Sequence, residues 1–105
     1  MSALTFDHGD TLIIVDDRVL EVFRRGVEGS HRIPLAWLGA WLDTGKPGRT
    51  RIVIGARTTA GGPVYSEQPQ QLSAVWRLPV EDEGALARYR AFFAEVAALA
   101  GRPPS

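Results

Sequence analysis

The sequence predicts an α+β fold that is mainly β: an antiparallel barrel or sandwich of about six to seven short strands, capped by one C-terminal amphipathic helix. Three observations lead to this prediction. The one strong helical pattern lies at about residues 82–100. The residues before it form short apolar runs separated by Gly, Pro and Asp. At 105 residues the chain has the length of one ordinary domain, so we expect residues 1–105 to share a single core.

The first two strands are predicted as a hairpin that follows a polar start. Residues 11–15 are β-branched and apolar, and the pattern resumes at residues 19–24 after the turn-forming segment 16–18. In the second run Leu20 and Val22 share one face, while the residues between them alternate to the other face. This alternation is typical of a strand with one buried and one mixed face.

The middle of the chain predicts one more strand and then a bend. A strand is expected to start at His31 and to reach a sheet edge or a strand end at the proline three residues later. Leu35, Leu38 and Trp41 then recur every three residues, which indicates either one turn of helix or a sharply bent strand. Residues 43–48 are predicted to form a loop.

The last strands are expected at residues 51–57, 64–66 and 72–78, and the helix follows them. Asp82 is a good N-cap residue, and Gly101 ends the helical pattern. One side of the predicted helix is apolar and should pack on the strands. This stripe contains Leu86, Tyr89, Phe92, Phe93, Val96, Leu99 and Ala100.

Composition narrows the classes of partner. Twelve basic and twelve acidic residues cancel, so we expect no nucleic-acid partner and no general attraction to a membrane surface. The chain has no cysteine, which removes disulfides, thiolate chemistry and cysteine-based metal sites. No apolar run reaches the roughly 20 residues that cross a bilayer, and the first residues show no secretory leader. We therefore expect a cytoplasmic protein. Eleven arginines against the single Lys46 suggest a GC-rich bacterial genome.

Two groups of residues resemble a known superfold. The first is Arg32-Ile33-Pro34-Leu35, followed by Leu38 and Trp41. The second runs from Trp76 through residues 77–80 and continues at residues 86–89. Together they resemble an uncharacterised bacterial family of pleckstrin-homology-like domains, over residues 12–99.

This resemblance implies a β-framework closed by a C-terminal helix. The resemblance to pleckstrin-homology domains that bind phosphoinositides would also imply a basic cluster in the first hairpin loop. Here that loop contains Asp16, Asp17 and Arg18 and is net acidic, which departs from the phosphoinositide-binding pattern. Many domains of this superfold bind peptides or proteins instead, and this is an analogy of fold.

Basic residues near the second loop form the first candidate site. Arg24, Arg25, His31 and Arg32 offer donors for a carboxylate or a phosphate, and Arg51 extends the set from a later strand. The alternative interpretation is a solvated hairpin end with local ion pairs, which contribute only about 0 to 1 kcal/mol each.

The tryptophans form the second candidate site. Trp37 and Trp41 are predicted interface residues, because aromatic side chains commonly anchor protein interfaces. The alternative is that they fill the core together with Trp76.

No pattern in the sequence indicates catalysis, a metal site or a cofactor. The two histidines, His8 and His31, are too far apart for a local zinc motif, and no serine stands in a glycine-flanked nucleophile turn. We therefore expect a non-enzymatic module that binds a protein or peptide, a second copy of the chain included. Binding of an anionic small molecule or lipid headgroup through the arginine cluster is the alternative function.

Overall fold

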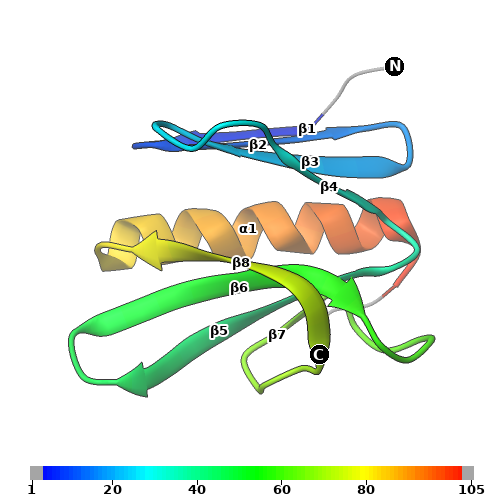
Figure 1. Ribbon diagram of the computed structural model, residues 1–105. Helices are drawn as coiled ribbons and strands as arrows, with labels where there is room; N and C mark the ends of the chain where they lie inside the picture. The colour runs from blue at the N-terminus through cyan, green and yellow to red at the C-terminus, as the bar shows by residue number, and fades with distance from the viewer. Residues whose placement is uncertain (1–3, 103–105) are drawn as a thin grey trace.

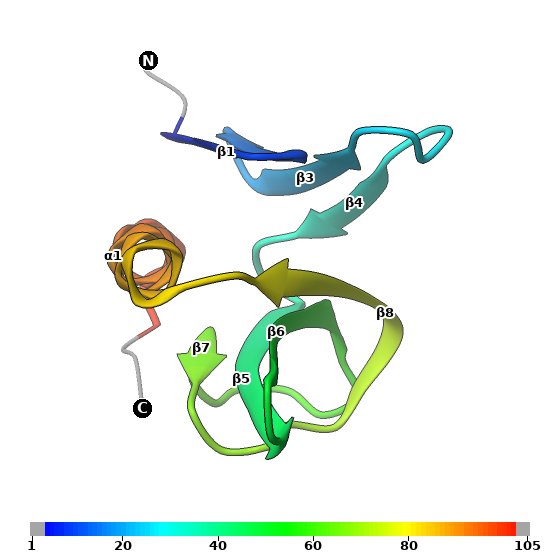
Figure 2. The same ribbon diagram turned by 90° about the vertical axis from the view of Figure 1, so that its left-hand side faces the viewer.

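The computed structural model describes residues 4–102 and contains two four-stranded sheets and one helix within them (Figure 1). The predicted class, mainly β with one C-terminal helix, is therefore confirmed. The sheets lie on opposite sides of the helix in Figure 1, and the view in Figure 2 shows the helix at one side of the gap between them.

The N-terminal sheet is an antiparallel meander in the order β1-β2-β3-β4. Its strands are β1 (Leu4–His8), β2 (Thr11–Asp16), β3 (Val19–Arg24) and β4 (His31–Pro34). The predicted hairpin of β2 and β3 is confirmed, with Val15 paired to Leu20 across it. Alternate residues of these two strands are buried, so one face of the sheet points into the molecule.

The C-terminal sheet has the order β7-β5-β6-β8, in which β7 runs parallel to β5 and the other pairs are antiparallel. Its strands are β5 (Leu38–Lys46), β6 (Arg49–Arg57), β7 (Tyr65–Ser66) and β8 (Leu72–Val80). A register shift interrupts the pairing of β6 with β8 between Ile54 and Ala56. Beyond the shift β8 curves around the sheet, as Figure 2 shows.

The helix α1 (Glu83–Ala100) begins and ends at the residues that the sequence indicates. The Asp82 carboxylate accepts a hydrogen bond of 2.7 Å from the backbone amide of Ala85, which caps the N-terminus. Gly101 takes a left-handed conformation with φ of 69°, and its amide bonds to carbonyls of the last turn. As the helix found in residues 4–102, α1 does not combine the length and apolar character needed to span a membrane.

One cluster of buried side chains joins both sheets to α1. Tyr89 of the helix stacks on Phe6 of β1 with ring centroids 4.3 Å apart, and Phe93 stacks on Tyr65 of β7 at 5.6 Å. The helix therefore contacts the edge strand of each sheet. Figure 1 shows this placement, with α1 between β1 and β7.

The structure differs from the predictions in five respects. A strand, β1, lies in the segment read as a polar start, and it brings the strands in residues 4–102 to eight. Residues 43–46 continue β5 where a loop was expected, and Leu35 to Trp37 form a turn, without helix or bent strand. Leu99 of the predicted apolar stripe is 52% exposed. Neither sheet closes into a barrel within the described residues.

Candidate functional site

The structure does not gather the predicted basic residues into one site. Arg25 is exposed and pairs with Asp10 at 3.1 Å. Arg32 is exposed on the outer face of β4, opposite Glu21 of β3. Because neighbouring residues of a strand point to opposite faces, His31 lies on the inner face, away from Arg32.

Arg24 and His31 both reach β8 across the gap between the two sheets. The His31 ring stacks on Trp76 with centroids 5.6 Å apart and an angle of 19° between the planes. Arg24 Nη1 lies 3.5 Å from the carbonyl oxygen of Arg77, the outer limit of a hydrogen bond. Nε2 of His31 and Nε of Arg24 are buried and lack hydrogen-bond partners among residues 4–102. This pair of side chains joins the sheets and offers little to a ligand.

Arg51 lies on the other sheet, in an ion pair with Asp43 at 2.7 Å across β5 and β6. Hydrogen bonds from the Arg51 guanidinium and from the Gly45 amide hold the pKa of the Asp43 carboxyl below its usual value. A hollow of about 500 Å³ next to this pair is lined by Arg49, Arg51 and Arg77 together with the carboxylate residue Glu81. The sequence could not place Arg77 here, because that depends on which strand pairs with β6.

Trp37 is the predicted interface residue that the structure presents most openly, with 61% of its surface exposed. It ends the turn between β4 and β5, at the edge of the N-terminal sheet. Trp41 is half-buried on the outer face of β5, paired with Val53 and Ser66 on the adjoining strands. Trp76 is half-buried and packs against the core, as the alternative interpretation predicted for it.

The turn that presents Trp37 is held by hydrogen bonds to three other parts of the chain. The amide of Leu35 donates to the Arg18 carbonyl, and the amide of Arg57 donates to the Trp37 carbonyl, each at 2.7 Å. The Arg102 guanidinium donates to the carbonyls of Leu35 and Leu38, also at 2.7 Å. These bonds fix the backbone on both sides of an exposed aromatic ring.

A second surface, which the sequence-based search for sites missed, is the outer face of the N-terminal sheet. Four apolar side chains on it are partly exposed and lie outside the core cluster: Leu12, Ile14, Val19 and Phe23. We call these four residues the outer apolar face. The mixed face predicted for residues 19–24 was the signal for it, but one strand alone does not show whether another layer covers that face.

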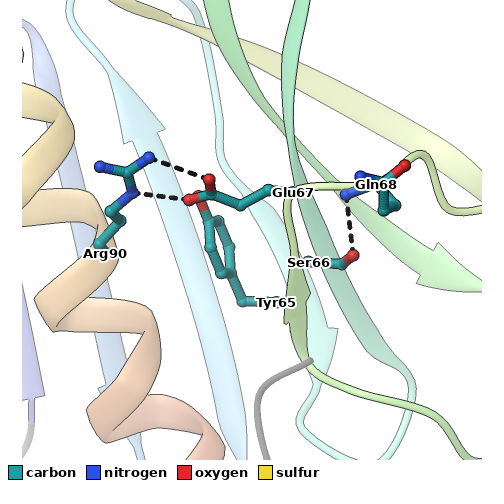
Figure 3. A network of polar contacts seen from close by, with 5 residues as sticks. All are labelled: Tyr65, Ser66, Glu67, Gln68 and Arg90. Carbon is teal, nitrogen blue, oxygen red and sulfur yellow. Dashed lines mark hydrogen bonds and ion pairs between the residues drawn. The ribbon is translucent and has the colours of Figure 1, made fainter.

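Polar contacts between α1 and β7 form a closed network, drawn in Figure 3. Arg90 donates to both carboxylate oxygens of Glu67, at 2.6 and 2.9 Å, and the Tyr65 hydroxyl donates to the same carboxylate at 3.0 Å. Burial, reinforced by Glu67, raises the pKa of Tyr65 to about 12, and Arg90 lowers the pKa of Glu67. The three groups satisfy one another and dock the helix on the sheet.

Within residues 4–102, no group of three or more His, Cys, Asp or Glu side chains is placed to hold a metal ion. Comparison of the chain with protein-family models, curated proteins and solved structures found no match. The choice between functions therefore depends on the surfaces described above.

Proposed function

We propose that the chain is a non-catalytic, pleckstrin-homology-like module that recognises a protein or peptide, a second copy of itself included, with Trp37 as the anchor. The observation that carries this proposal is the 61% exposure of Trp37 on a firmly held turn. Tryptophan is enriched among the residues that dominate binding energy at interfaces. Burial of its apolar surface by a partner would contribute favourable free energy.

The way the turn is held favours tight binding. An anchor that is already fixed loses less conformational entropy when it is buried by a partner. Arg102, which bonds to the carbonyls of Leu35 and Leu38, also links this turn to the end of α1. The end of the helix and the strands therefore hold the Trp37 turn together.

The pleckstrin-homology-like assignment is supported by the order of the elements. The resemblance implies a β-framework followed by a C-terminal helix, and two sheets, antiparallel apart from the β5–β7 pair, precede α1 here. Shifted pKa values often mark catalytic groups. The shifted groups Tyr65, Glu67 and Arg90 bond to one another and dock α1, which supports the non-catalytic assignment.

The test is selection of peptides from a random display library on the immobilised chain, followed by binding measurements with a Trp37→Ala variant. We expect the selected peptides to bind the variant at least about tenfold more weakly. Val27→Ala is the matched control, because Val27 is 49% exposed on another loop. The proposal is wrong if no peptide is enriched and the chain stays monomeric at high concentration, or if Trp37→Ala leaves binding unchanged.

A second candidate function is binding of an anionic small molecule or lipid headgroup. The hollow lined by Arg49, Arg51 and Arg77 favours it, since Asp43 holds one guanidinium in place while the other two arginines are exposed. Titration with pyrophosphate, and with vesicles that contain anionic lipid, tests this function. The double variant Arg49→Glu/Arg77→Glu should abolish the heat of binding. Unchanged binding would exclude this hollow as the anion site.

A further inference from the structure

We infer that the outer apolar face of the N-terminal sheet binds a basic amphipathic helix of a partner protein. The inference rests on the proposed role in protein recognition, and it assigns a surface separate from Trp37 together with the chemistry of its partner. Three features of the sheet support it: cross-strand register, exposure and the distribution of charge.

Register places the apolar side chains in adjacent rows. Leu12 pairs with Phe23, and Ile14 lies one row along β2, opposite Glu21 of β3. Val19 follows in the third row, beside Pro34 of β4. Rows on one face are about 6.8 Å apart, so the three rows span about 14 Å along the strands, while the apolar side chains occupy two adjacent strands about 4.8 Å apart.

No element of residues 4–102 covers this face. The opposite face of the same sheet carries the buried residues Ile13, Val15, Leu20 and Val22 and looks toward α1 and the C-terminal sheet. In Figure 1 no helix or strand lies above the outer face of β1 to β3. A solvated sheet face is ordinarily polar, and a contiguous apolar group on it marks an interaction surface.

Acidic side chains surround the apolar rows. A hollow of about 430 Å³ at one end is lined by Ile14 and Val19 with Asp16, Asp17, Glu21 and Arg32. Asp7 stands opposite Leu12 at the other end, where Asp10 is neutralised by Arg25. Four carboxylates, at Asp7, Asp16, Asp17 and Glu21, thus outnumber two guanidiniums, that of Arg32 and that of Arg18 in the adjoining turn, although the whole chain has no net charge. This excess of negative charge fits a basic partner and repels an anionic lipid surface.

The dimensions favour a helix as the partner element. An apolar face, as opposed to an open edge, is covered by packing another layer on it, and a helix packed on a sheet is a common solution. About three helical turns measure about 16 Å in length and 10–12 Å in width, so such a helix covers the three rows and both strands, β2 and β3, that carry the apolar side chains. Lysine or arginine on both flanks of the helix would reach the surrounding carboxylates.

The test uses a designed peptide of about four turns that contains only leucine and lysine, with the leucines on one side. Two matched peptides replace every lysine by glutamate or every leucine by serine. Binding to the ¹⁵N-labelled chain is followed by NMR. We expect the leucine-lysine peptide alone to bind, to shift amide resonances of β2 and β3, and to weaken as salt is raised.

Variants of the chain locate the contact. Asp16→Lys and Glu21→Lys should each weaken binding about tenfold, whereas Glu95→Lys on the exposed side of α1 changes the net charge equally and should have little effect. Phe23→Thr removes apolar area from a partly exposed strand position and should also weaken binding.

Three results would overturn the inference: equal binding of the acidic peptide, resonance shifts confined to other elements, or concentration-dependent shifts of β2 and β3 without peptide. The last result would make a second copy of the chain the partner. Trp37→Ala separates this inference from the proposed function, because it should leave binding of the leucine-lysine peptide unchanged.

Discussion

Ala74 occupies a backbone conformation that suits glycine better than alanine. Its φ is 50°, in the left-handed region, at the bulge where β8 passes Gly55 of β6. A Cβ at Gly55 would lie 2.7 Å from the Ser73 carbonyl oxygen, so the close approach of the strands requires glycine at that position. The register shift thus leaves the strain on Ala74.

We predict that Ala74→Gly stabilises the protein by about 0.5–1 kcal/mol, because relief of the left-handed strain exceeds the entropy that glycine adds to the unfolded chain. Urea unfolding measures the change. Ala87→Gly, at an exposed position of α1, is the control and should destabilise by about 1 kcal/mol. Destabilisation by Ala74→Gly would mean that the bulge does not strain residue 74.

The two tyrosines provide a test of burial by titration. Burial raises the pKa of Tyr65 to about 12 and also raises the pKa of Tyr89. We predict that tyrosinate absorbance of the folded chain develops above pH 10, and that denaturant returns both groups to about 10. Because the folded pKa of Tyr65 is the higher one, its contribution to stability is complete below about pH 10 and is lost as the pH rises toward 12.

Tyr65→Phe should remove the titration step near pH 12 and leave the Tyr89 step unchanged. A Tyr65 step near 10 in the folded wild type would show that the hydroxyl is open to water and that β7 is not closed over by α1.

At the scale of single residues, the sequence shows which side chains are present but not which of them lie next to one another in the fold. The sequence offers the arginines and tryptophans as candidate binding groups, but strand parity decides where each one points. His31 and Arg32 are adjacent in the chain and lie on opposite faces. Arg77 is 26 residues from Arg51 and lines the same hollow, which only the pairing of β6 with β8 brings about.

At the scale of elements, the docking of α1 on β7 depends on an ion pair that acid should break. Arg90 holds the pKa of Glu67 below its usual value of about 4.5 in the folded chain. The stabilisation is therefore complete above the unfolded pKa and is lost as the pH falls through the lower, folded value. We predict that Glu67→Gln destabilises the chain at neutral pH and that its difference from wild type shrinks below about pH 4.

Urea unfolding at a series of pH values measures this difference. The matched variant Asp43→Asn should behave similarly, because Arg51 lowers the pKa of Asp43 in the same way. If the loss of stability in Glu67→Gln stays constant with pH, the contact between Glu67 and Arg90 stabilises the chain through packing and not through charge.

The elements with a complete local signal were predicted well. Helix α1 has a cap residue, a periodic apolar stripe and a terminal glycine, and its predicted limits agree with the structure. Strand β1 was missed because only Leu4 and Phe6 alternate with polar residues in it, and its pairing partner β2 lies across a two-residue turn. The extension of β5 through Gly45 was missed because glycine and proline locally favour a loop, whereas pairing with β6 overrides that preference.

At the scale of the whole molecule, the sequence established the class of the fold but not the arrangement of its layers. Apolar periodicity shows that a strand has a buried face, and it does not show which layer buries that face. Leu12 and Ile13 look equally apolar in the sequence, yet Ile13 is fully buried and Leu12 lies on the outer face. The outer apolar face and the open sheets therefore became visible only in three dimensions.

One helix holds the two sheets together, and this leads to a prediction about the unfolding of the whole chain. Phe93 is fully buried and stacks on Tyr65 of β7, while its neighbours Tyr89 and Phe92 pack on Phe6 of β1. Phe93→Ala opens a cavity where the helix meets the C-terminal sheet, and we predict a loss of about 3–5 kcal/mol. Leu99→Ala, at a position of the same helix that is 52% exposed, should cost far less.

If the shared core makes the sheets one cooperative unit, hydrogen exchange of β2 and of β6 should accelerate together in Phe93→Ala. Since both strands contribute fully buried residues to the core cluster, they should report the same global opening. Faster exchange in β6 with unchanged exchange in β2 would show instead that the N-terminal sheet is stable on its own. The helix would then be a contact between two folding units, and the outer apolar face would belong to a separable meander.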